Sequence, residues 1–110
     1  MNPILISPTV YVLKLENDKI YVGITMNLNM RLAQHWSGQG ACWTKRHKPL
    51  ELLQVIPFAS KEIEDRTTRL YMKDWGAENV RGGRYVQATV SKKLKCFIET
   101  SSEEELQNPI

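Results

Sequence analysis

Two tyrosines, a glycine and an arginine occur at spacings that could bring them together on one surface. Tyr11 and Tyr21 each lie in a short stretch rich in strand-forming residues, and Gly23 follows Tyr21 by two positions. Arg31 follows in a segment with helical spacing. Arginine offers a planar fork of N–H donors that matches phosphate oxygens, and a phenol can orient or deprotonate an attacking water. These residue types therefore suit the binding and hydrolysis of a phosphodiester.

The register of a predicted hairpin decides whether the tyrosines share a face. Residues 8–15 and 19–25 each predict a strand, and side chains alternate between the two faces of a strand. A two-residue turn would put Tyr11 and Tyr21 on opposite faces. A turn with an odd number of residues puts them on one face with Gly23 and leaves a continuous β-branched core face, so we favour it. Glycine weakens a strand unless something approaches closely, and here a phosphate backbone is a candidate.

A helix over residues 27–37 is predicted to carry the cationic groups. Its apolar face repeats at spacing four and consists of Leu28, Leu32 and Trp36. Arg31 and His35 are also four residues apart, so they share one side of the helix and border the apolar face. They can therefore overhang the tyrosines. Arg31 would stabilise charge on a phosphate, and His35 could act as an acid or base near neutral pH.

A basic loop over residues 38–49 is the second feature of interest. An aromatic residue, Trp43, precedes a cluster of cationic side chains. The cluster consists of Lys45, Arg46 and Lys48. Such a loop can contact phosphates and stack one ring on a base. The alternative is a solvated loop whose tryptophan folds back onto the core.

The rest of the chain predicts, in order, a buried strand, a helix, a turn and a short helix. They are expected at residues 50–57, 61–75, 81–84 and 91–100. The order ββαβα plus a C-terminal helix predicts an α+β fold, with a small three-stranded antiparallel sheet flanked by helices. We expect residues 1–98 to form a single domain and residues 99–110 to form an acidic, flexible tail.

The charge distribution favours a polyanionic partner. Four of the 12 acidic residues lie after residue 98, so residues 1–98 carry 15 basic and eight acidic residues, a net charge of +7. Nucleic acid is the commonest partner of such a basic globule. The sequence has no apolar run long enough to span a membrane and no signal-peptide pattern. We therefore expect no membrane association and an intracellular location, cytoplasmic or nuclear.

These residues together resemble the GIY-YIG endonuclease superfamily, particularly its small stand-alone members. Thr9-Val10-Tyr11 stands at the first motif triplet, with threonine in place of glycine, and Tyr21-Val22-Gly23 stands at the second. Arg31 falls at the catalytic arginine of the family, and His35 lies where several members carry histidine. The resemblance covers residues 8–85 and supports the same α+β fold.

The resemblance implies a metal-dependent endonuclease that hydrolyses phosphodiester bonds in DNA. It implies that Tyr11 acts as a general base or orients water, and that Tyr21 and Arg31 attend the scissile phosphate. It also implies Mg²⁺ or Mn²⁺, held by a glutamate on the later helix. That glutamate position aligns with Thr68, so we take Glu64, one helical turn earlier, as the metal ligand.

Two functions remain open on the sequence. The first is a DNA endonuclease that selects its substrate by structure, because the chain has no obvious second DNA-reading domain. The second is a catalytically degenerate domain that binds nucleic acid without cutting it, which Thr68 motivates. Asn79 is a further candidate contact, near a polar position at the rim of the family's site. The residues do not distinguish DNA from RNA, and an oligomer or a partner protein could supply specificity.

Overall fold

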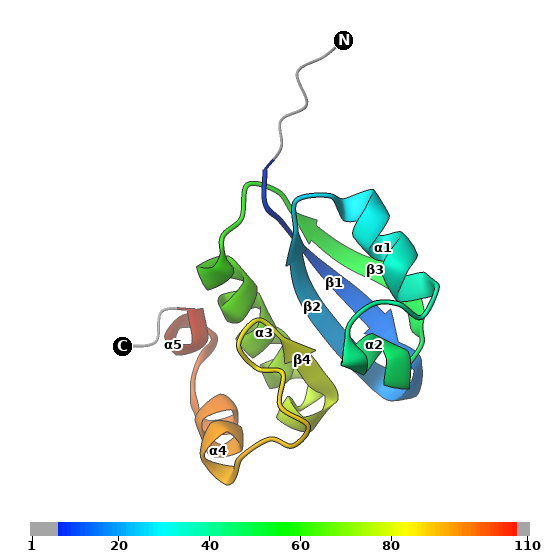
Figure 1. The fold of residues 1–110 in the computed structure, drawn as a ribbon. Coiled ribbons are helices and arrows are strands. Elements are labelled where there is room, and N and C mark those ends of the chain that lie inside the picture. The colour runs from blue at the N-terminus through cyan, green and yellow to red at the C-terminus, as the bar shows by residue number, and fades with distance from the viewer. Residues whose placement is uncertain (1–6, 108–110) are drawn as a thin grey trace.

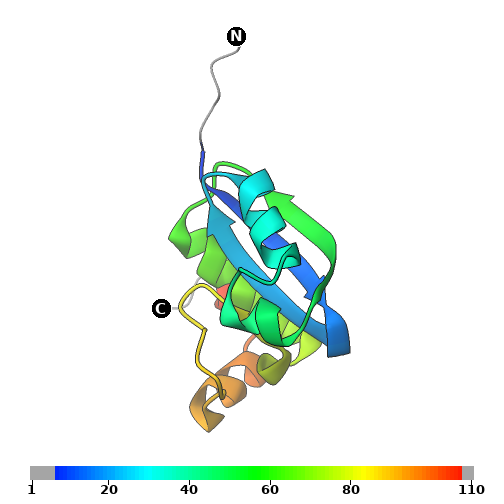
Figure 2. The same ribbon diagram turned by 45° about the vertical axis from the view of Figure 1, so that its right-hand side comes forward.

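The computed structural model describes residues 7–107. The strands are β1 (Thr9–Leu15), β2 (Lys19–Thr25), β3 (Pro49–Ile56) and β4 (Val80–Gly82). The helices are α1 (Leu28–Trp36), α2 (Cys42–Arg46), α3 (Lys61–Trp75), α4 (Lys92–Thr100) and α5 (Glu103–Gln107). One sheet in the order β3-β1-β2-β4 forms the middle layer (Figure 1). Helices α1 and α2 cover one face of the sheet, and α3, α4 and α5 lie on the other side (Figure 2). The predicted α+β fold is confirmed.

The β1–β2 hairpin has the register that the sequence favours. A three-residue turn, Glu16–Asp18, joins the two strands. Tyr11 pairs with Gly23, and Leu13 pairs with Tyr21. Because partners directly opposite each other in the ladder share a face, both tyrosines lie on the same face of the sheet. The prediction of a turn with an odd number of residues is therefore confirmed.

Side-chain caps fix where three of the helices begin. Asn27, Ser60 and Ser91 each accept a hydrogen bond from the backbone N–H three residues ahead. A cap of this kind contributes about 1 kcal/mol. The helices predicted over residues 27–37, 61–75 and 91–100 are confirmed to within one residue at each end. No helix within residues 7–107 combines the length and the apolar character needed to cross a membrane.

The two faces of the hairpin pack against different helices. The core face combines strand residues with side chains of α3, α4 and α5. It includes Val10, Val12, Ile20, Val22, Met72, Ile98 and Leu106. On the opposite face, Tyr11 and Leu13 are fully buried and pack against Leu32 of α1. The prediction that Trp36 packs inward is wrong, because 47% of its surface is exposed and His35 is the buried residue of α1.

Strand β3 is an edge strand, not the buried strand that the sequence predicts. It pairs antiparallel with β1 alone, and most of its side chains are exposed. Leu50 is 54% exposed and Val55 is 42% exposed. A short apolar run does not reveal whether its strand lies at the centre or at the edge of a sheet, which explains the error.

The sheet has four strands and is mixed, whereas the sequence predicts three antiparallel strands; the additional strand is β4. Its three residues pair parallel with β2, so that Tyr21 lies opposite Arg81 and Val22 lies opposite Gly82. The sequence predicts only a turn here, because a three-residue strand with a glycine shows no alternation. Likewise α2 lies within residues 38–49, where the sequence predicts a loop.

The end of the described chain, up to Gln107, is packed against α3, and the last residues of the tail expected from residue 99 lie outside the described part. Leu106 of α5 is fully buried. Its carbonyl accepts a hydrogen bond from Arg69 Nε at 2.7 Å, and the carbonyl of Gln107 accepts one from Arg66 Nε at 3.1 Å. The acidic composition of this segment does not reveal the contact, because the contact depends on one apolar side chain and on backbone carbonyls.

Candidate active site

The structure gathers three aromatic rings beneath α1. The ring centroids of Tyr11 and Tyr21 are 6.2 Å apart, and the His35 ring lies 5.6 Å from Tyr11 and 5.1 Å from Tyr21. Tyr11 and His35 are each 1% exposed, whereas Tyr21 is half-buried. Tyr21 is therefore the phenol that a substrate can reach most directly.

A chain of hydrogen bonds fixes the buried tyrosine. The Thr44 hydroxyl donates to the carbonyl of Ala41, so its oxygen accepts from His35 Nδ1 at 2.9 Å. This arrangement places the imidazole proton on Nδ1 and leaves Nε2 to accept from the Tyr11 hydroxyl at 2.6 Å. Gly40 is needed for this packing, because a side chain there would overlap the His35 ring. The chain holds Tyr11 in one orientation.

The titratable groups of this cluster are held neutral. Burial, reinforced by the positive charge of Arg31, lowers the pKa of His35 from 6.5 to about 4. Burial also raises the pKa of both phenols, and Arg31 offsets part of the rise. At neutral pH the cluster therefore consists of a neutral imidazole, two neutral phenols and one permanent cation.

Arg31 lies over the tyrosines, as its helical spacing predicts. Its guanidinium is close enough to lower the pKa of both Tyr11 and Tyr21. Its Nη1 donates to the Gln34 side chain at 2.8 Å, and the residue as a whole is half-buried. A guanidinium fixed beside two phenols offers several N–H and O–H groups to the oxygens of one phosphate.

Gly23 serves this cluster in a way that the sequence does not reveal. The expected close approach at Gly23 is made by the ring of Tyr11, which a Cβ atom at this position would overlap. Tyr11 lies directly opposite Gly23 in the ladder, so the ring needs that space. The glycine therefore permits the tyrosine packing, where the sequence suggested room for a phosphate.

A carboxylate cleft lies on the α3 side of the sheet edge. Its lining includes Lys61, Glu64, Asp65, Gly83 and Arg84. Asp65 is engaged: it accepts the Arg84 backbone N–H at 2.9 Å and Arg84 Nε at 2.8 Å. Burial, followed by the Asp65 charge, raises the pKa of Glu64. The Glu64 charge in turn raises the pKa of Tyr11 and Tyr21, which places this carboxylate within electrostatic reach of the phenols.

Thr68 cannot offer a metal ligand in this arrangement. It is fully buried, and its hydroxyl donates to the Glu64 carbonyl at 2.7 Å. It also lies directly against Gly82 of β4, where an added Cβ atom would clash with its hydroxyl. Position 68 is therefore packed closely against β4, and the carboxylates that line the cleft are Glu64 and the Arg84-bound Asp65.

A single carboxylate of this kind is compatible with Mg²⁺ or Mn²⁺. No cluster of three or more histidine, cysteine or acidic side chains suited to a metal occurs in residues 7–107. Mg²⁺ nevertheless often binds through one or two carboxylates, several waters and the phosphates of its substrate. Burial and the Asp65 charge raise the pKa of the half-buried Glu64, so a nearby cation would stabilise its charged form. Glu64 therefore fits as a ligand, although Asp65 is committed to Arg84.

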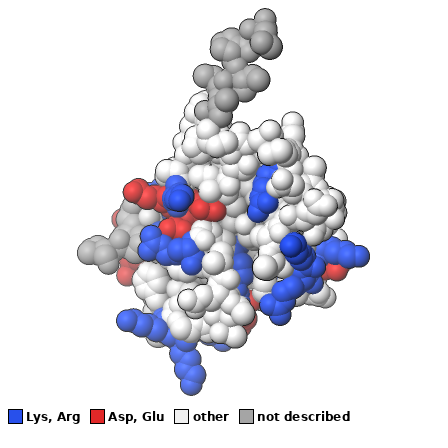
Figure 3. Space-filling view, viewed as in Figure 1, with Lys and Arg blue, Asp and Glu red and all other residues white. Residues whose placement is uncertain are grey.

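The basic residues predicted around Trp43 form a basic rim on and after α2, and one of them, Arg46, lines a cleft together with Tyr21. Lys45, Arg46 and Lys48 are exposed on and after α2, and Figure 3 shows basic side chains gathered over this helix. Trp43 itself is held in place, because its indole N–H donates to the Ile20 carbonyl at 3.0 Å. Its ring packs against the cluster of Tyr11, Leu13 and Leu15 on the sheet. This matches the alternative in which the tryptophan folds back onto the core, more than a ring free to stack on a base.

Asn79 lies apart from the tyrosine cluster. Its side chain accepts from Lys19 Nζ at 2.7 Å and donates to the Trp75 carbonyl at 2.8 Å. Lys19 begins β2 at the turn end of the hairpin, four residues before Gly23. Asn79 thus joins α3 to the sheet.

The sequence analysis does not identify Thr44, Asp65 or Arg84 as residues of the site, because their roles depend on contacts between distant segments. The only sequence signal is the pair of glycines at positions 82 and 83, which indicates a close approach of the backbone.

The neutral His35 predicts a specific dependence of stability on pH. In the unfolded chain His35 takes up a proton near pH 6.5, whereas in the folded protein it stays neutral down to about pH 4. Between these values the unfolded state binds more protons, so the free energy of unfolding falls as the pH drops, by up to about 3 kcal/mol. Urea unfolding at about pH 7.5 and about pH 4.5 measures the loss.

The His35→Gln variant is the comparison for this experiment. Glutamine cannot titrate, so the loss on acidification should be smaller than in the wild type. His47→Gln, at the more exposed histidine, should retain most of the wild-type dependence. An identical pH dependence in the wild type and in His35→Gln would show that the imidazole is not held neutral.

Comparisons with known proteins show the family of the chain. The model of the GIY-YIG catalytic domain matches residues 7–79. A UPF0213 protein of Bacillus pumilus is 34% identical over 90 residues, which cover 76% of this chain and 92% of the relative. UPF0213 proteins of Cupriavidus pinatubonensis and Natronomonas pharaonis are 43% and 40% identical over 51 and 52 residues.

The last two matches are partial. They cover 46% and 47% of this chain, and 57% and 61% of the relatives, which is less than two thirds of their length. No solved structure was found to match the chain. The family-model match spans most of the sheet, α1 and α3, and it contains both tyrosines and Arg31. The chain therefore belongs to the GIY-YIG catalytic-domain family, within the nuclease superfamily.

Proposed function

We propose that this protein is a metal-dependent endonuclease that hydrolyses phosphodiester bonds in DNA. The observation that carries the proposal is the convergence of Tyr11 and Tyr21 with Arg31 of α1, with Glu64 within electrostatic reach. A permanent cation beside two hydroxyl groups can bind a phosphate and stabilise the negative charge that grows during its hydrolysis.

In this proposal each residue has a distinct role. Tyr21 and Arg31 bind the scissile phosphate, and Tyr11 orients the attacking water. Both phenols act as neutral hydrogen-bonding groups, because burial raises the pKa of each. His35 is a positioning residue, because a pKa of about 4 makes it a poor proton acceptor at neutral pH. Glu64 would hold Mg²⁺ or Mn²⁺, which supplies Lewis-acid stabilisation of the phosphoryl oxygens when bound.

The basic rim would bind the flanking strand. Lys45, Arg46 and Lys48 are exposed and can neutralise phosphates on either side of the scissile bond, which makes binding strongly dependent on salt. These contacts carry no sequence information. Substrate selection would therefore come from nucleic-acid shape, an oligomer or a partner protein. RNA is the alternative substrate, because phosphate contacts do not separate it from DNA.

The test is cleavage of supercoiled plasmid by the purified protein. We expect nicked and linear products with Mg²⁺ or Mn²⁺, and none when the metal is chelated. A matched reaction with single-stranded RNA establishes whether RNA is also a substrate. If plasmid stays intact with every divalent metal tried, the protein is not this nuclease.

A second candidate is a domain that binds nucleic acid without cutting it. The burial of Thr68 at the family's glutamate position and the 1% exposure of Tyr11 favour it. It predicts that DNA is retained in gel-shift experiments with a steep salt dependence and is recovered uncut.

A further inference from the structure

A cleft of about 400 Å³ opens beside Tyr21, between α2 and residues 86–88. Its lining combines small or apolar residues with two cations and an indole. These residues are Ala41, Cys42, Trp43, Arg46, Arg81, Val86 and Ala88. In Figure 3 basic side chains gather on the α2 side. The cleft adjoins the candidate active site, because Tyr21 belongs to both.

The base of the cleft is rigid. The Arg81 guanidinium lies 4.5 Å from the centroid of the Trp43 ring, whose N–H is bonded to the Ile20 carbonyl. Arg81 also donates to the carbonyls of Gln87 at 2.7 Å and Ala88 at 3.0 Å. It further bonds carbonyls at positions 77, 78 and 80. Arg81 therefore holds the second wall of the cleft against β4, so the cleft exists before any ligand binds.

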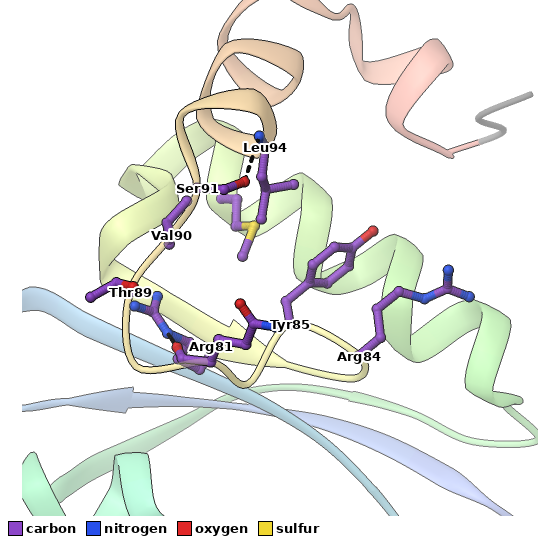
Figure 4. A pocket seen from close by; sticks show the side chains of 9 residues that line it. Arg81, Arg84, Tyr85, Thr89, Val90, Ser91 and Leu94 are labelled. Atoms are coloured by element: carbon purple, nitrogen blue, oxygen red, sulfur yellow. Dashed lines mark hydrogen bonds between the residues drawn. The ribbon is translucent and has the colours of Figure 1, made fainter.

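The second wall lies beyond the residues that the family model matches. Arg81, Val86 and Ala88 all follow residue 79, where the family match ends. A separate pocket, lined by Met72, Tyr85, Gln87 and Leu94 among others, adjoins the same segment (Figure 4). Gln87 lines that pocket and Ala88 lines the cleft. A substitution at Ala88 can therefore test the cleft, and the same substitution at the neighbouring Gln87 can serve as its control.

We infer that this cleft binds an unpaired nucleotide adjacent to the scissile phosphodiester; the inference rests on the proposed nuclease function. The apolar walls suit the faces of a base, and the exposed Arg46 suits the phosphate attached to it. A base inside a duplex must leave its stack and its partner before it can enter such a cleft, and an unpaired base avoids that cost. The substrate is then DNA with a flap, a gap or a single-stranded end at the cleavage site.

The experiment measures binding with the metal chelated, so that it does not depend on cleavage. Two duplexes carry 2-aminopurine at the same position, unpaired in a flap in one and fully paired in the other. The wild type is expected to bind the flapped duplex about tenfold more tightly. Ala88→Trp fills the cleft from an exposed position and should remove this preference, while Gln87→Trp should keep it.

Circular dichroism establishes whether each variant is folded. If Ala88→Trp does not fold, Val86→Trp repeats the test, because Val86 also lines the cleft and is 63% exposed. Equal binding of the two duplexes by the wild type overturns the inference. So does an unchanged preference in a folded cleft-filling variant. Plasmid cleavage by the wild type is scored separately. If the wild type cleaves plasmid but shows no preference for the flapped duplex, only the inference about the cleft is refuted. If it prefers the flapped duplex but cleaves nothing, only the proposed nuclease function is refuted.

Discussion

The Arg31→Ala variant should lose about 10²- to 10³-fold of the metal-dependent cleavage rate, the usual effect of removing one preorganised donor from a developing oxyanion. Arg31 is the one cation placed close to both phenols in the cluster described here. The residue is half-buried and sits on α1, whose beginning is fixed by the Asn27 cap. We therefore expect the melting temperature to change little. Initial rates of nicking, measured at saturating protein, report the loss.

Two further variants serve as comparisons, one at position 31 that separates geometry from charge and one at a cation elsewhere. Arg31→Lys keeps the positive charge but loses the planar fork, so it should recover only a small part of the rate. Lys93→Ala removes one exposed cation from α4, outside the candidate site, and should cleave at nearly the wild-type rate. Cleavage by Arg31→Ala at the wild-type rate, in a folded protein, would exclude the mechanism built on this arginine.

Local patterns account for most of the fold that the sequence predicts. Alternating β-branched residues fix the faces of the hairpin, and capped helices begin where Asn27 and Ser60 can accept a backbone N–H. The placement of Tyr11 and Tyr21 on one face follows from one choice, the odd turn, which the apolar face favours. These features are readable because neighbouring residues determine them.

The features that the sequence misses depend on contacts between distant segments. Positions 35 and 36 are adjacent on α1, and hydrophobicity alone favours burial of Trp36. His35 is buried instead because Tyr11 and Thr44 satisfy both of its ring nitrogens. Only knowledge of α2 could reveal the Thr44 contact.

Strand β4 shows the same limit where it meets α3. Its backbone approaches α3 so closely that Gly82 meets Thr68 directly. The turn that follows ties Arg84 to Asp65, through one backbone and one side-chain hydrogen bond. These contacts explain physically why position 68 carries a small residue. Of the two carboxylates that line the cleft, Asp65 is engaged by Arg84, which leaves Glu64 as the candidate metal ligand.

The Glu64→Gln variant should therefore lose metal-dependent cleavage by at least about 10²-fold, because a metal ion at a phosphoryl oxygen contributes several kcal/mol of charge stabilisation. Glutamine preserves the size of the side chain and removes its charge. Binding of DNA with the metal chelated should persist or tighten slightly, since one negative charge leaves a surface that faces phosphates. The measurements are nicking rate against Mg²⁺ concentration and DNA affinity in the presence of chelator.

Glu62→Gln is the matched control, because Glu62 lies in the same first turn of α3 and is exposed. It changes the net charge by the same amount as Glu64→Gln, so any difference between the two variants comes from the position of the carboxylate. The control should keep the wild-type rate and the wild-type dependence on Mg²⁺. Wild-type rates in both variants would mean that Glu64 does not hold the metal. An equal loss of rate in both variants would instead be explained by the charge at the helix terminus, which each substitution changes by the same amount.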